Sequence, residues 1–385
     1  MKIKVAKLMA VILTVSILFS AFLIPTHAQE QSASLSLDCK SAILMEAQTG
    51  AVLYASNETQ PLPPASVTKV MTLLLVMEAI ERGQIKYTDM VSASEHACSM
   101  GGSQIYLEVG EQMSVEDLLK SVVIASANDA AVALAEYICG TEEAFVEKMN
   151  ERAKELGMND TVFENTNGLD DTTDTHLTSA KDIAIMSREL IKYPKITEYS
   201  RIWMDTIRNG EFGLTNTNRL VRFYEGATGL KTGSTSKAGF CITATATRGD
   251  MTLIAVIMGA DTRDARNAAA VSLLNYGFSN YALYKHKYAD IPDIAVNRGE
   301  QDNCSLVAEE FCAVVPKQKK NAVKATISVR TDIAAPFSIE SEVGEVIYTL
   351  DGAEIGRAKI LTEYGVDKMT FWDIFLRILS KMLLK

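Results

Sequence analysis

The chain has 385 residues, a length that allows two or three domains. Hydrophobic residues make up 48% of it and charged residues 22%, so it can build a globular core. The formal net charge is −10, which argues against nucleic acid as a partner because phosphate binding needs a basic surface.

Residues 1–28 have the pattern of an export signal. Three lysines precede an uncharged, mostly apolar run at residues 8–24, and Thr-His-Ala at 26–28 resembles a cleavage site. The lysines are Lys2, Lys4 and Lys7. We expect cleavage after Ala28, and an uncleaved membrane anchor is the alternative because the apolar run is long. Either way, we expect the rest of the chain to work outside the cytoplasmic membrane.

Histidines and cysteines give no sign of a metal site or cofactor. Neither Cys-x-x-Cys nor His-Glu-x-x-His occurs, and the chain has only four histidines. The six cysteines are Cys39, Cys98, Cys139, Cys241, Cys304 and Cys312. An exported chain can form disulfides, but one of this length has enough core without them. We expect Cys139 and Cys241 to be buried thiols, and a Cys304–Cys312 pair stays open.

Residues 29–286 are predicted to form one domain with strands at both ends and helices between them. Two strands at 42–46 and 51–55 are followed by a helix over 66–82. Further helices are expected at 114–124, 129–138, 142–156 and 179–191, the last of them capped by Thr178. Strands at 238–247 and 251–259 then precede a helix over 263–284. This order fits one antiparallel sheet covered by helices, with a helical lobe beside it.

The chain beyond a boundary near residues 285–290 reads as strands only. Residues 322–330 alternate well, and 346–350 turn at Asp351-Gly352 into a return strand. We therefore predict a small all-β domain over 287–363, without a catalytic constellation and with a spacer or docking role.

Residues 364–385 are predicted to form an amphipathic helix. Its broad apolar face includes Trp372, whereas Asp373, Arg377 and Lys381 recur at every fourth position. Charges on every turn disfavour a helix that spans a membrane. We expect the helix to lie in the membrane interface, and the alternative is a terminal helix docked on its own domain.

The most informative motif is Ser66-x-x-Lys69, at the start of the first long helix. The spacing puts both side chains on one helical face, one turn apart. A serine hydroxyl becomes a good nucleophile when a nearby base takes its proton, and a neutral lysine amine can be that base. The motif alone is weak, since a helix-capping serine followed by an exposed lysine has the same spacing.

Two further motifs follow it in the chain: Ser126-Ala127-Asn128, between two helices, and Lys231-Thr232-Gly233, at the start of the later strands. The set in this order is typical of serine β-lactamases and penicillin-binding proteins. The chain closely resembles the low-molecular-mass penicillin-binding proteins that are D-alanyl-D-alanine carboxypeptidases. The resemblance rests on Pro-Ala-Ser-Val-Thr-Lys-Val-Met-Thr at 64–72, Ser-Ala-Asn at 126–128 and Lys-Thr-Gly-Ser-Thr at 231–235. It extends to the domain order and implies the α/β (α+β) fold of that class, a sheet with a helical cluster.

The resemblance implies how the catalytic residues act. Ser66 attacks the carbonyl between two terminal D-alanines, and a neutral Lys69 takes its proton. The backbone N–H groups of Ser66 and Ser234 form an oxyanion hole, where fixed donors stabilise the charge of the transition state. Ser126, helped by Lys231, relays the proton to the leaving D-alanine. Water then hydrolyses the acyl-enzyme.

The substrate-binding residues implied by the resemblance are Asn128, Lys231, Thr232, Gly233, Ser234 and Arg266. Asn128 holds the peptide backbone, and Lys231 and Thr232 meet the substrate carboxylate. An edge strand here can pair with the extended peptide. Arg266 stands where the family has a carboxylate-binding arginine, a task that suits a guanidinium; a surface helix residue facing an aspartate is the other interpretation.

We therefore predict a serine-type D-alanyl-D-alanine carboxypeptidase, a hydrolase without cofactors, on the outer face of a bacterial cytoplasmic membrane. Its expected partners are peptidoglycan stem peptides, β-lactams as inhibitors and the membrane surface. A D,D-endopeptidase would use the same residues. A β-lactamase would need a glutamate such as Glu164 to activate water, and a β-lactam sensor would keep its acyl group. His96 and Cys98 are expected to be loop residues without a catalytic role.

Overall fold

The structure is a computed structural model that describes residues 35–171 and 173–383. The predicted export signal at residues 1–28 lies outside the described residues. The predicted mixed architecture of helices and sheet, followed by an all-β domain, is confirmed.

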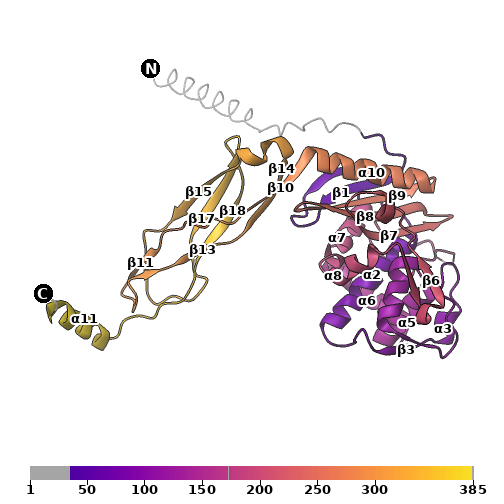
Figure 1. Ribbon diagram of the computed structural model, residues 1–385, viewed down its shortest axis with the longest axis horizontal. Helices are drawn as coiled ribbons and strands as arrows, with labels where there is room; N and C mark the ends of the chain where they lie inside the picture. Colours follow the sequence, from indigo (N-terminus) through magenta and orange to yellow (C-terminus); the bar gives the residue numbers. More distant parts are fainter. Residues whose placement is uncertain (1–34, 172, 384–385) are drawn as a thin grey trace, which may run out of the picture. The chain divides into compact units, whose positions relative to one another are not determined.

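A five-stranded antiparallel sheet is the frame of the first domain (Figure 1). Its order is β2-β1-β9-β8-β7. The strands are β1 (Ser41–Glu46), β2 (Val52–Ser56), β7 (Ala227–Thr235), β8 (Gly239–Arg248) and β9 (Met251–Ala260). Strands from the two ends of the domain therefore meet in one sheet, as the sequence predicted. β7 is an edge strand, so one side of it is available to another extended chain.

Helices cover both faces of this sheet. α10 (Arg263–Asn280) packs on one face, where Gly277 lies so close to the side chains of Leu44 and Leu253 that a Cβ atom would come within 3 Å of both. α7 (Ala180–Leu190) and α8 (Pro194–Ser200) pack on the other face (Figure 1). Burying both faces is why β9 is almost continuously apolar.

A helical lobe lies beside the sheet. It consists of α2 (Lys69–Glu81), α3 (Glu95–Cys98), α4 (Val115–Lys120), α5 (Asn128–Cys139) and α6 (Glu142–Glu155). Every residue from the first position of α2 to Ala79 is buried, which makes α2 the central helix of the lobe and explains its weakly amphipathic sequence.

Shorter elements connect these parts. They are the 3₁₀ turn η1 (Ala65–Thr68), the π turn η2 (Ser121–Ala125), the 3₁₀ turn η3 (Arg208–Gly210), α9 (Leu220–Phe223), and the two-stranded sheets of β3 (Met90–Ser92) with β4 (Gln112–Ser114) and of β5 (Met204–Ile207) with β6 (Phe212–Thr215). The sequence did not predict these two small sheets, because their strands are only three or four residues long.

The following domain is built from strands around its own core. Its four-stranded sheet has the order β13-β18-β17-β15. The elements are β10 (Tyr281–His286), β11 (Ile294–Asn297), β12 (Asn303–Cys304), β13 (Leu306–Ala308), β14 (Phe311–Pro316), the 3₁₀ turn η4 (Lys317–Ala322), β15 (Lys324–Val329), β16 (Asp332–Ala334), β17 (Glu342–Leu350) and β18 (Ala353–Thr362). Phe311 and Tyr348 stack in its core, with ring centroids 4.0 Å apart.

Several helix ends differ from the sequence predictions. The helix expected over 263–284 ends at Asn280, because Tyr281–His286 forms β10 and pairs with β14 across the predicted boundary at residue 287. The helix expected from Ser66 begins at Lys69, after a 3₁₀ turn. Ser179, not Thr178, caps α7, because its side chain accepts the Asp182 N–H.

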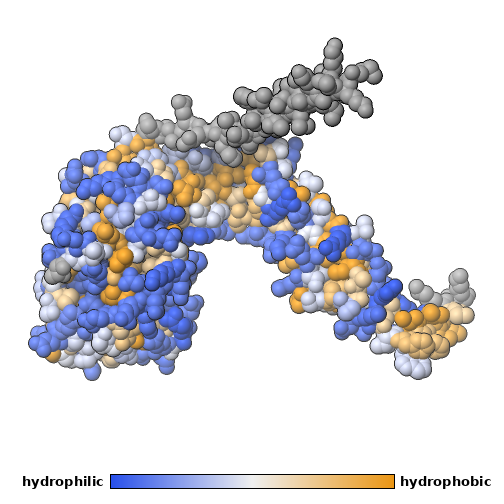
Figure 2. Space-filling model, turned by 180° about the vertical axis from the view of Figure 1, so that it is seen from behind, coloured by the Kyte–Doolittle hydropathy of each residue, from blue (hydrophilic) through white to orange (hydrophobic). Residues whose placement is uncertain are grey.

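α11 (Phe371–Leu383) forms within the segment 364–385 that was predicted to be helical, and it starts later than residue 364. Its apolar side chains are largely exposed; Phe371 is 74% exposed and Met382 73%, and Figure 2 shows apolar residues gathered on this helix. In the described part of the chain, none of the helices is long and apolar enough to cross a membrane.

All six cysteines are free thiols. Cys304 is buried with its Sγ near the Tyr364 carbonyl oxygen, Cys312 is half-buried, and the two do not pair. Cys241 is buried as predicted, whereas Cys139 is only half-buried.

Candidate active site

Ser66 and Lys69 meet where η1 runs into α2. Lys69 Nζ lies 2.9 Å from Ser66 Oγ. Ser66 is half-buried and faces a cavity, whereas Lys69 is fully buried. The burial of Lys69 argues against the alternative of a capping serine and an exposed lysine. Lysine is rarely buried without a partner, and here Ser66 is one such partner.

Two glycines let other segments approach the turn that carries Ser66. A Cβ atom on Gly233 of β7 would lie 2.8 Å from Ser66 N, and one on Gly168 would lie 1.9 Å from Ala65 O. Gly168 also has a φ of +85°, which side chains rarely adopt. The glycine of the Lys-Thr-Gly motif is therefore needed for the contact of β7 with the Ser66 backbone, on which the predicted oxyanion hole depends.

A buried histidine supports the same turn from behind. His176 Nδ1 accepts the N–H of Glu164 at 3.0 Å, so its Nε2 carries the hydrogen and donates to Thr68 Oγ1 at 2.7 Å. Thr68 in turn donates to Ala65 O at 2.8 Å. Burial lowers the pKa of His176 to about 4, which keeps the ring neutral in this bridge.

The Lys69 amine has two more oxygen neighbours, Asn128 Oδ1 at 2.6 Å and the backbone oxygen of Asn167 at 2.7 Å. Burial lowers the pKa of Lys69 well below its usual value, nearby Lys231 lowers it further, and Asp129 acts in the opposite direction. A neutral amine has two hydrogens and one lone pair. Donating to the two oxygens leaves the lone pair facing the Ser66 hydroxyl, the geometry of a general base.

Ser126 reaches the site from a distorted segment. The π turn η2 ends at Ala125, and the next residue, Ser126, has a left-handed φ of 65°; such turns and backbone conformations concentrate at functional sites. Lys231 Nζ donates to Ser126 Oγ at 2.8 Å and to Thr232 O at 2.9 Å. Burial, followed by the charge of Arg266, lowers the pKa of Lys231 to about 7. Ser126 and Lys231 can thus donate a proton to a group in the cavity.

Asn128 is fixed on both sides of its amide. Its Nδ2 donates to Gly101 O at 2.6 Å, and its backbone N–H donates to Ser103 O at 2.7 Å. One Nδ2 hydrogen remains for a substrate carbonyl, but the Asn128 oxygen is already engaged by Lys69. Asn128 therefore orients the base as well as being available to a peptide, and the sequence predicted only the second role.

The two serines and the Lys-Thr-Gly strand open into one cavity of about 600 Å³. Its lining includes Ser66, Ser126, Thr232, Gly233, Ser234 and Arg266. Arg266 is buried at 3% exposure and faces this cavity, so it is not a surface helix residue. The structure thus brings together all nine residues that the sequence predicted.

Sequence reasoning missed several residues of the same site. Thr217 accepts a hydrogen bond from Thr232 Oγ1 at 2.8 Å, and the cavity is also lined by Trp203, Arg219, Phe223 and Arg263. None belongs to a motif of fixed spacing. They come from the short β5–β6 and α9 segments and from the start of α10, which only the fold brings to the cavity.

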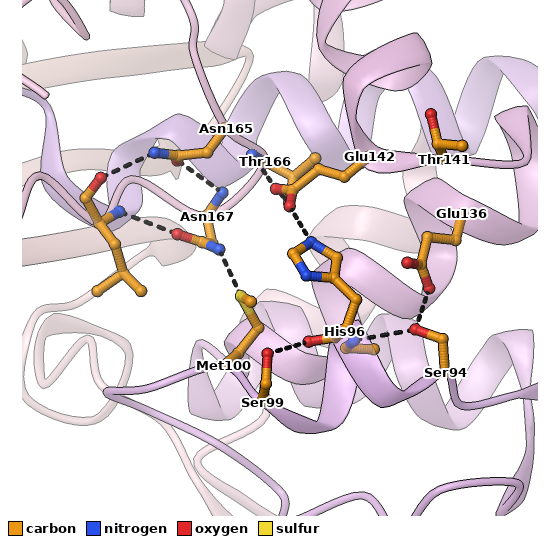
Figure 3. A network of polar contacts seen from close by, with 12 residues as sticks. Ser94, His96, Ser99, Met100, Glu136, Thr141, Glu142, Asn165, Thr166 and Asn167 are labelled. Atoms are coloured by element: carbon orange, nitrogen blue, oxygen red, sulfur yellow. Dashed lines mark hydrogen bonds and ion pairs between the residues drawn. The ribbon is translucent and has the colours of Figure 1, made fainter. Parts of the chain in front are cut away.

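A second polar network lies behind Asn167, as Figure 3 shows. Glu142 accepts from both the N–H and the hydroxyl of Thr166, at 2.9 and 2.7 Å, and its other oxygen lies 2.7 Å from His96 Nε2. This hydrogen bond raises the pKa of His96 above its usual value. His96 and Cys98 lie on the short helix α3 instead of the expected loop, and His96 buttresses the segment whose backbone holds Lys69.

Glu164 is placed away from the chemistry. Its carboxylate accepts hydrogen bonds from the hydroxyls of Thr173 and Thr175, and it is exposed and absent from the cavity lining. A glutamate that activates a hydrolytic water has to lie beside the acylated serine.

In chemical terms, the site holds a serine nucleophile, a buried amine that can be neutral, and a second serine–lysine pair at a cavity. This arrangement suits transfer of an acyl group to Ser66.

Comparisons with known proteins agree with this geometry. The family model described as D-alanyl-D-alanine carboxypeptidase matches residues 26–262, and the model of the penicillin-binding protein 5 C-terminal domain matches residues 278–368. The D-alanyl-D-alanine carboxypeptidase DacF of Bacillus subtilis is 43% identical over 350 residues, 89% of each chain. DacC of Escherichia coli is 33% identical over 374 residues, 92% of this chain and 93% of its own.

Solved structures show the same likeness. Penicillin-binding protein 5 from Haemophilus influenzae has a TM-score of 0.77 and 33% identity, covering 88% of this chain and all of its own. Penicillin-binding protein D2 from Listeria monocytogenes, in its ampicillin-bound form, has a TM-score of 0.59 and 31% identity, covering 64% of this chain and all of its own.

The contact between Gly168 and the turn before Ser66 generates a stability prediction. Gly168→Ala should lower the free energy of unfolding by about 3 kcal/mol, because the new methyl group collides with Ala65 O at a left-handed φ. Gly83→Ala is the matched control: its φ of +70° is also left-handed, but its Cβ would meet nothing, so about 1 kcal/mol is expected. Urea unfolding measures both, and equal losses would contradict the close contact.

Proposed function

This chain belongs to the D-alanyl-D-alanine carboxypeptidase family, and we propose that Ser66 is the nucleophile with which it removes a terminal D-alanine. It is a serine hydrolase of that activity and is acylated by β-lactams. The contact of Ser66 Oγ with the fully buried Lys69 amine carries the assignment of the nucleophile and base.

The proposed reaction starts with Ser66 Oγ attacking the carbonyl carbon between the two D-alanines, while Lys69 takes the hydroxyl proton. The N–H groups of Ser66 and Ser234 stabilise the oxyanion. The tetrahedral intermediate collapses, the C–N bond breaks, and Ser126, held by Lys231, delivers a proton to the departing amine. Water then attacks the acyl-enzyme and regenerates Ser66.

The proposed substrate is the stem peptide of peptidoglycan. Its extended backbone can pair with the free edge of β7, and the spare Nδ2 hydrogen of Asn128 can meet its amide oxygen. The terminal carboxylate is assigned to Thr232, Arg266 and the charge of Lys231, which face or adjoin the same cavity. The exposed position of Glu164 disfavours a β-lactamase.

We further propose the layout and location of the protein: an export signal at 1–28, the peptidase domain at 29–286, the β domain at 287–363 and a membrane-anchoring helix at 364–385. The exposed apolar side chains of α11, Trp372 among them, support a helix lying in the interface over one docked on its own domain. The protein would then act on the outer face of the cytoplasmic membrane as a peripheral protein.

Ser66→Ala should abolish both labelling by a fluorescent penicillin and release of D-alanine from a pentapeptide ending in D-alanyl-D-alanine, because, among the described residues, only Ser66 places a hydroxyl group against the Lys69 amine to form the ester. Ser99→Ala, an exposed serine outside the cavity, is the control and should keep both. A labelled Ser66→Ala protein would show that the nucleophile lies elsewhere.

The lowered pKa of Lys69 predicts the pH dependence of acylation. The second-order rate constant for penicillin should rise with pH as Lys69 loses its proton, and level off well below the ordinary lysine pKa of 10.5. Lys69→Arg, protonated throughout, should reduce this constant by about 10²–10⁴-fold, whereas Lys86→Arg on the surface should not change it. Stopped-flow acylation tests this, and a normal rate in Lys69→Arg would refute the role of base.

Removal of residues 366–385 should release the protein from the membrane fraction, because it removes the apolar face of α11. Flotation with anionic lipid vesicles measures the effect on the isolated protein. A variant with Asp373→Asn, which keeps the apolar face, is the control and should stay bound. Unchanged binding of the truncated protein would exclude α11 as the anchor.

A further inference from the structure

Three arginines line the cavity at Ser66, although the terminal carboxylate of a substrate requires only one. They are Arg219, Arg263 and Arg266, and Lys231 lies behind them. The described residues that line the cavity include no aspartate or glutamate. In a chain with a net charge of −10, this is a strong local excess of positive charge.

The arginines are close enough to destabilise one another's charge. Burial, followed by the charges of Arg263 and Arg219, lowers the pKa of Arg266 to about 10, and Asp264 partly opposes them. Clustered like charges cost free energy unless anions neutralise them. A ligand with one carboxylate would neutralise only part of this cluster.

Arg219 and Arg263 differ from the neighbouring arginines in having exposed head groups without protein partners. Among the residues that the structure describes, neither guanidinium donates a hydrogen bond or forms an ion pair. In contrast, Arg208 pairs with Glu111 at 2.7 Å, and Arg222 stacks on Trp203 and Phe223 at 5.4 and 5.5 Å from their ring centroids. The two free guanidiniums are therefore available to a ligand in the cavity.

The cavity corresponds to the leaving side of the proposed reaction. Ser126, which would protonate the departing amine, lines it, as do Thr232 and Arg266, which would hold the terminal carboxylate. Asn128, which would meet an amide oxygen of the peptide backbone, is not part of the lining. A cavity of about 600 Å³ has the size of sites that hold drug-sized ligands, far more than a departing D-alanine fills.

We propose that Arg219 and Arg263 form a subsite for a second carboxylate on the leaving group, so that the enzyme also cleaves bonds to acidic D-amino acids. The inference rests on the proposed function and names a further substrate class for the same site. The carboxylate next to the departing amine binds Arg266 and Thr232, and the second carboxylate binds the two free arginines. Trp203 and Phe223 provide an apolar wall for the carbons between them.

The chemistry is unchanged and balances in the same way. Ser66 Oγ forms an ester with the penultimate D-alanine, the C–N bond to the acidic D-amino acid breaks, and its nitrogen receives the proton lost by Ser66 through Lys69 and Ser126. Water then cleaves the ester, releasing the shortened donor peptide. Only the identity of the leaving amine differs from that in the carboxypeptidase reaction.

The test compares three synthetic acyl-D-alanyl peptides with the full-length enzyme, whose leaving groups are D-alanine, D-glutamate and D-glutamine. D-glutamate and D-glutamine have nearly the same size, so the ratio of their kcat/KM values isolates the second carboxylate. We expect a ratio of about 10 in favour of D-glutamate at low salt, equivalent to one well-formed charge pair. The ratio should fall as salt rises, because exposed charges are screened.

Substitutions of the two arginines test whether they cause the preference for D-glutamate. Arg219→Gln and Arg263→Gln should each lower the ratio to about 3, and the double variant should lower it to about 1. Arg330→Gln, an exposed arginine of the β domain, is the matched control and should keep the wild-type ratio. Stoichiometric labelling by penicillin reports that each variant is folded. If the double variant is not labelled, the ratios of the two single variants test the subsite instead.

The outcomes separate this inference from the proposed function. A wild-type ratio near 1, or a double variant that keeps the wild-type ratio, overturns the subsite while Ser66-dependent release of D-alanine leaves the carboxypeptidase mechanism intact. If D-alanine release does not depend on Ser66, the proposed function itself fails. A preference for D-glutamate that disappears in the double variant and persists in Arg330→Gln establishes the subsite.

Discussion

The burial of the Lys69 amine is the constraint on which the rest of the site depends. An ammonium group with no water around it is costly, so burial favours the neutral form, and the neutral amine is what can take a proton from Ser66. Lys231 strengthens this effect with its own charge. The oxygens of Asn128 and Asn167 fix the direction of the amine. One arrangement therefore sets both the protonation state of Lys69 and the orientation of its lone pair.

Keeping Lys69 buried requires segments from distant parts of the chain to close around η1. Gly233 brings the edge strand β7 against the Ser66 backbone, and Gly168 brings the 165–168 segment against Ala65. His176 then supports the Ser66 turn through Thr68, and the Glu142–His96 pair holds Thr166 of the 165–168 segment in place. A side chain at either glycine would push these layers apart, so the absence of a Cβ atom matters here more than conformational freedom alone.

Electrostatics divides the cavity into two functional parts. Near Ser66, lysines have lowered pKa values and serve proton transfer. Farther along, three arginines remain charged because guanidinium is a much stronger base than an amine. Proton transfer and anion binding can therefore occur side by side, since the residue types, as well as their positions, decide which groups keep a proton.

The sequence by itself determined the chemistry and the main elements of this protein. Ser66 and Lys69 are one helical turn apart, a proximity that spacing alone guarantees, and the alternating and periodic apolar patterns located β1, β8, β9, α5 and α6 to within about two residues at their ends. Ser126, Asn128 and Lys231 could be assigned only through their resemblance to a known set of motifs.

The tertiary structure decided the rest, because the contacts concerned join residues far apart in the chain. It placed Tyr281–His286 in a strand through its pairing with β14, left all the cysteines unpaired, engaged Asn128 with the base, and brought Arg219 and Arg263 beside Arg266. Local sequence patterns cannot specify such encounters, since they depend on how the sheet and the helical lobe pack together.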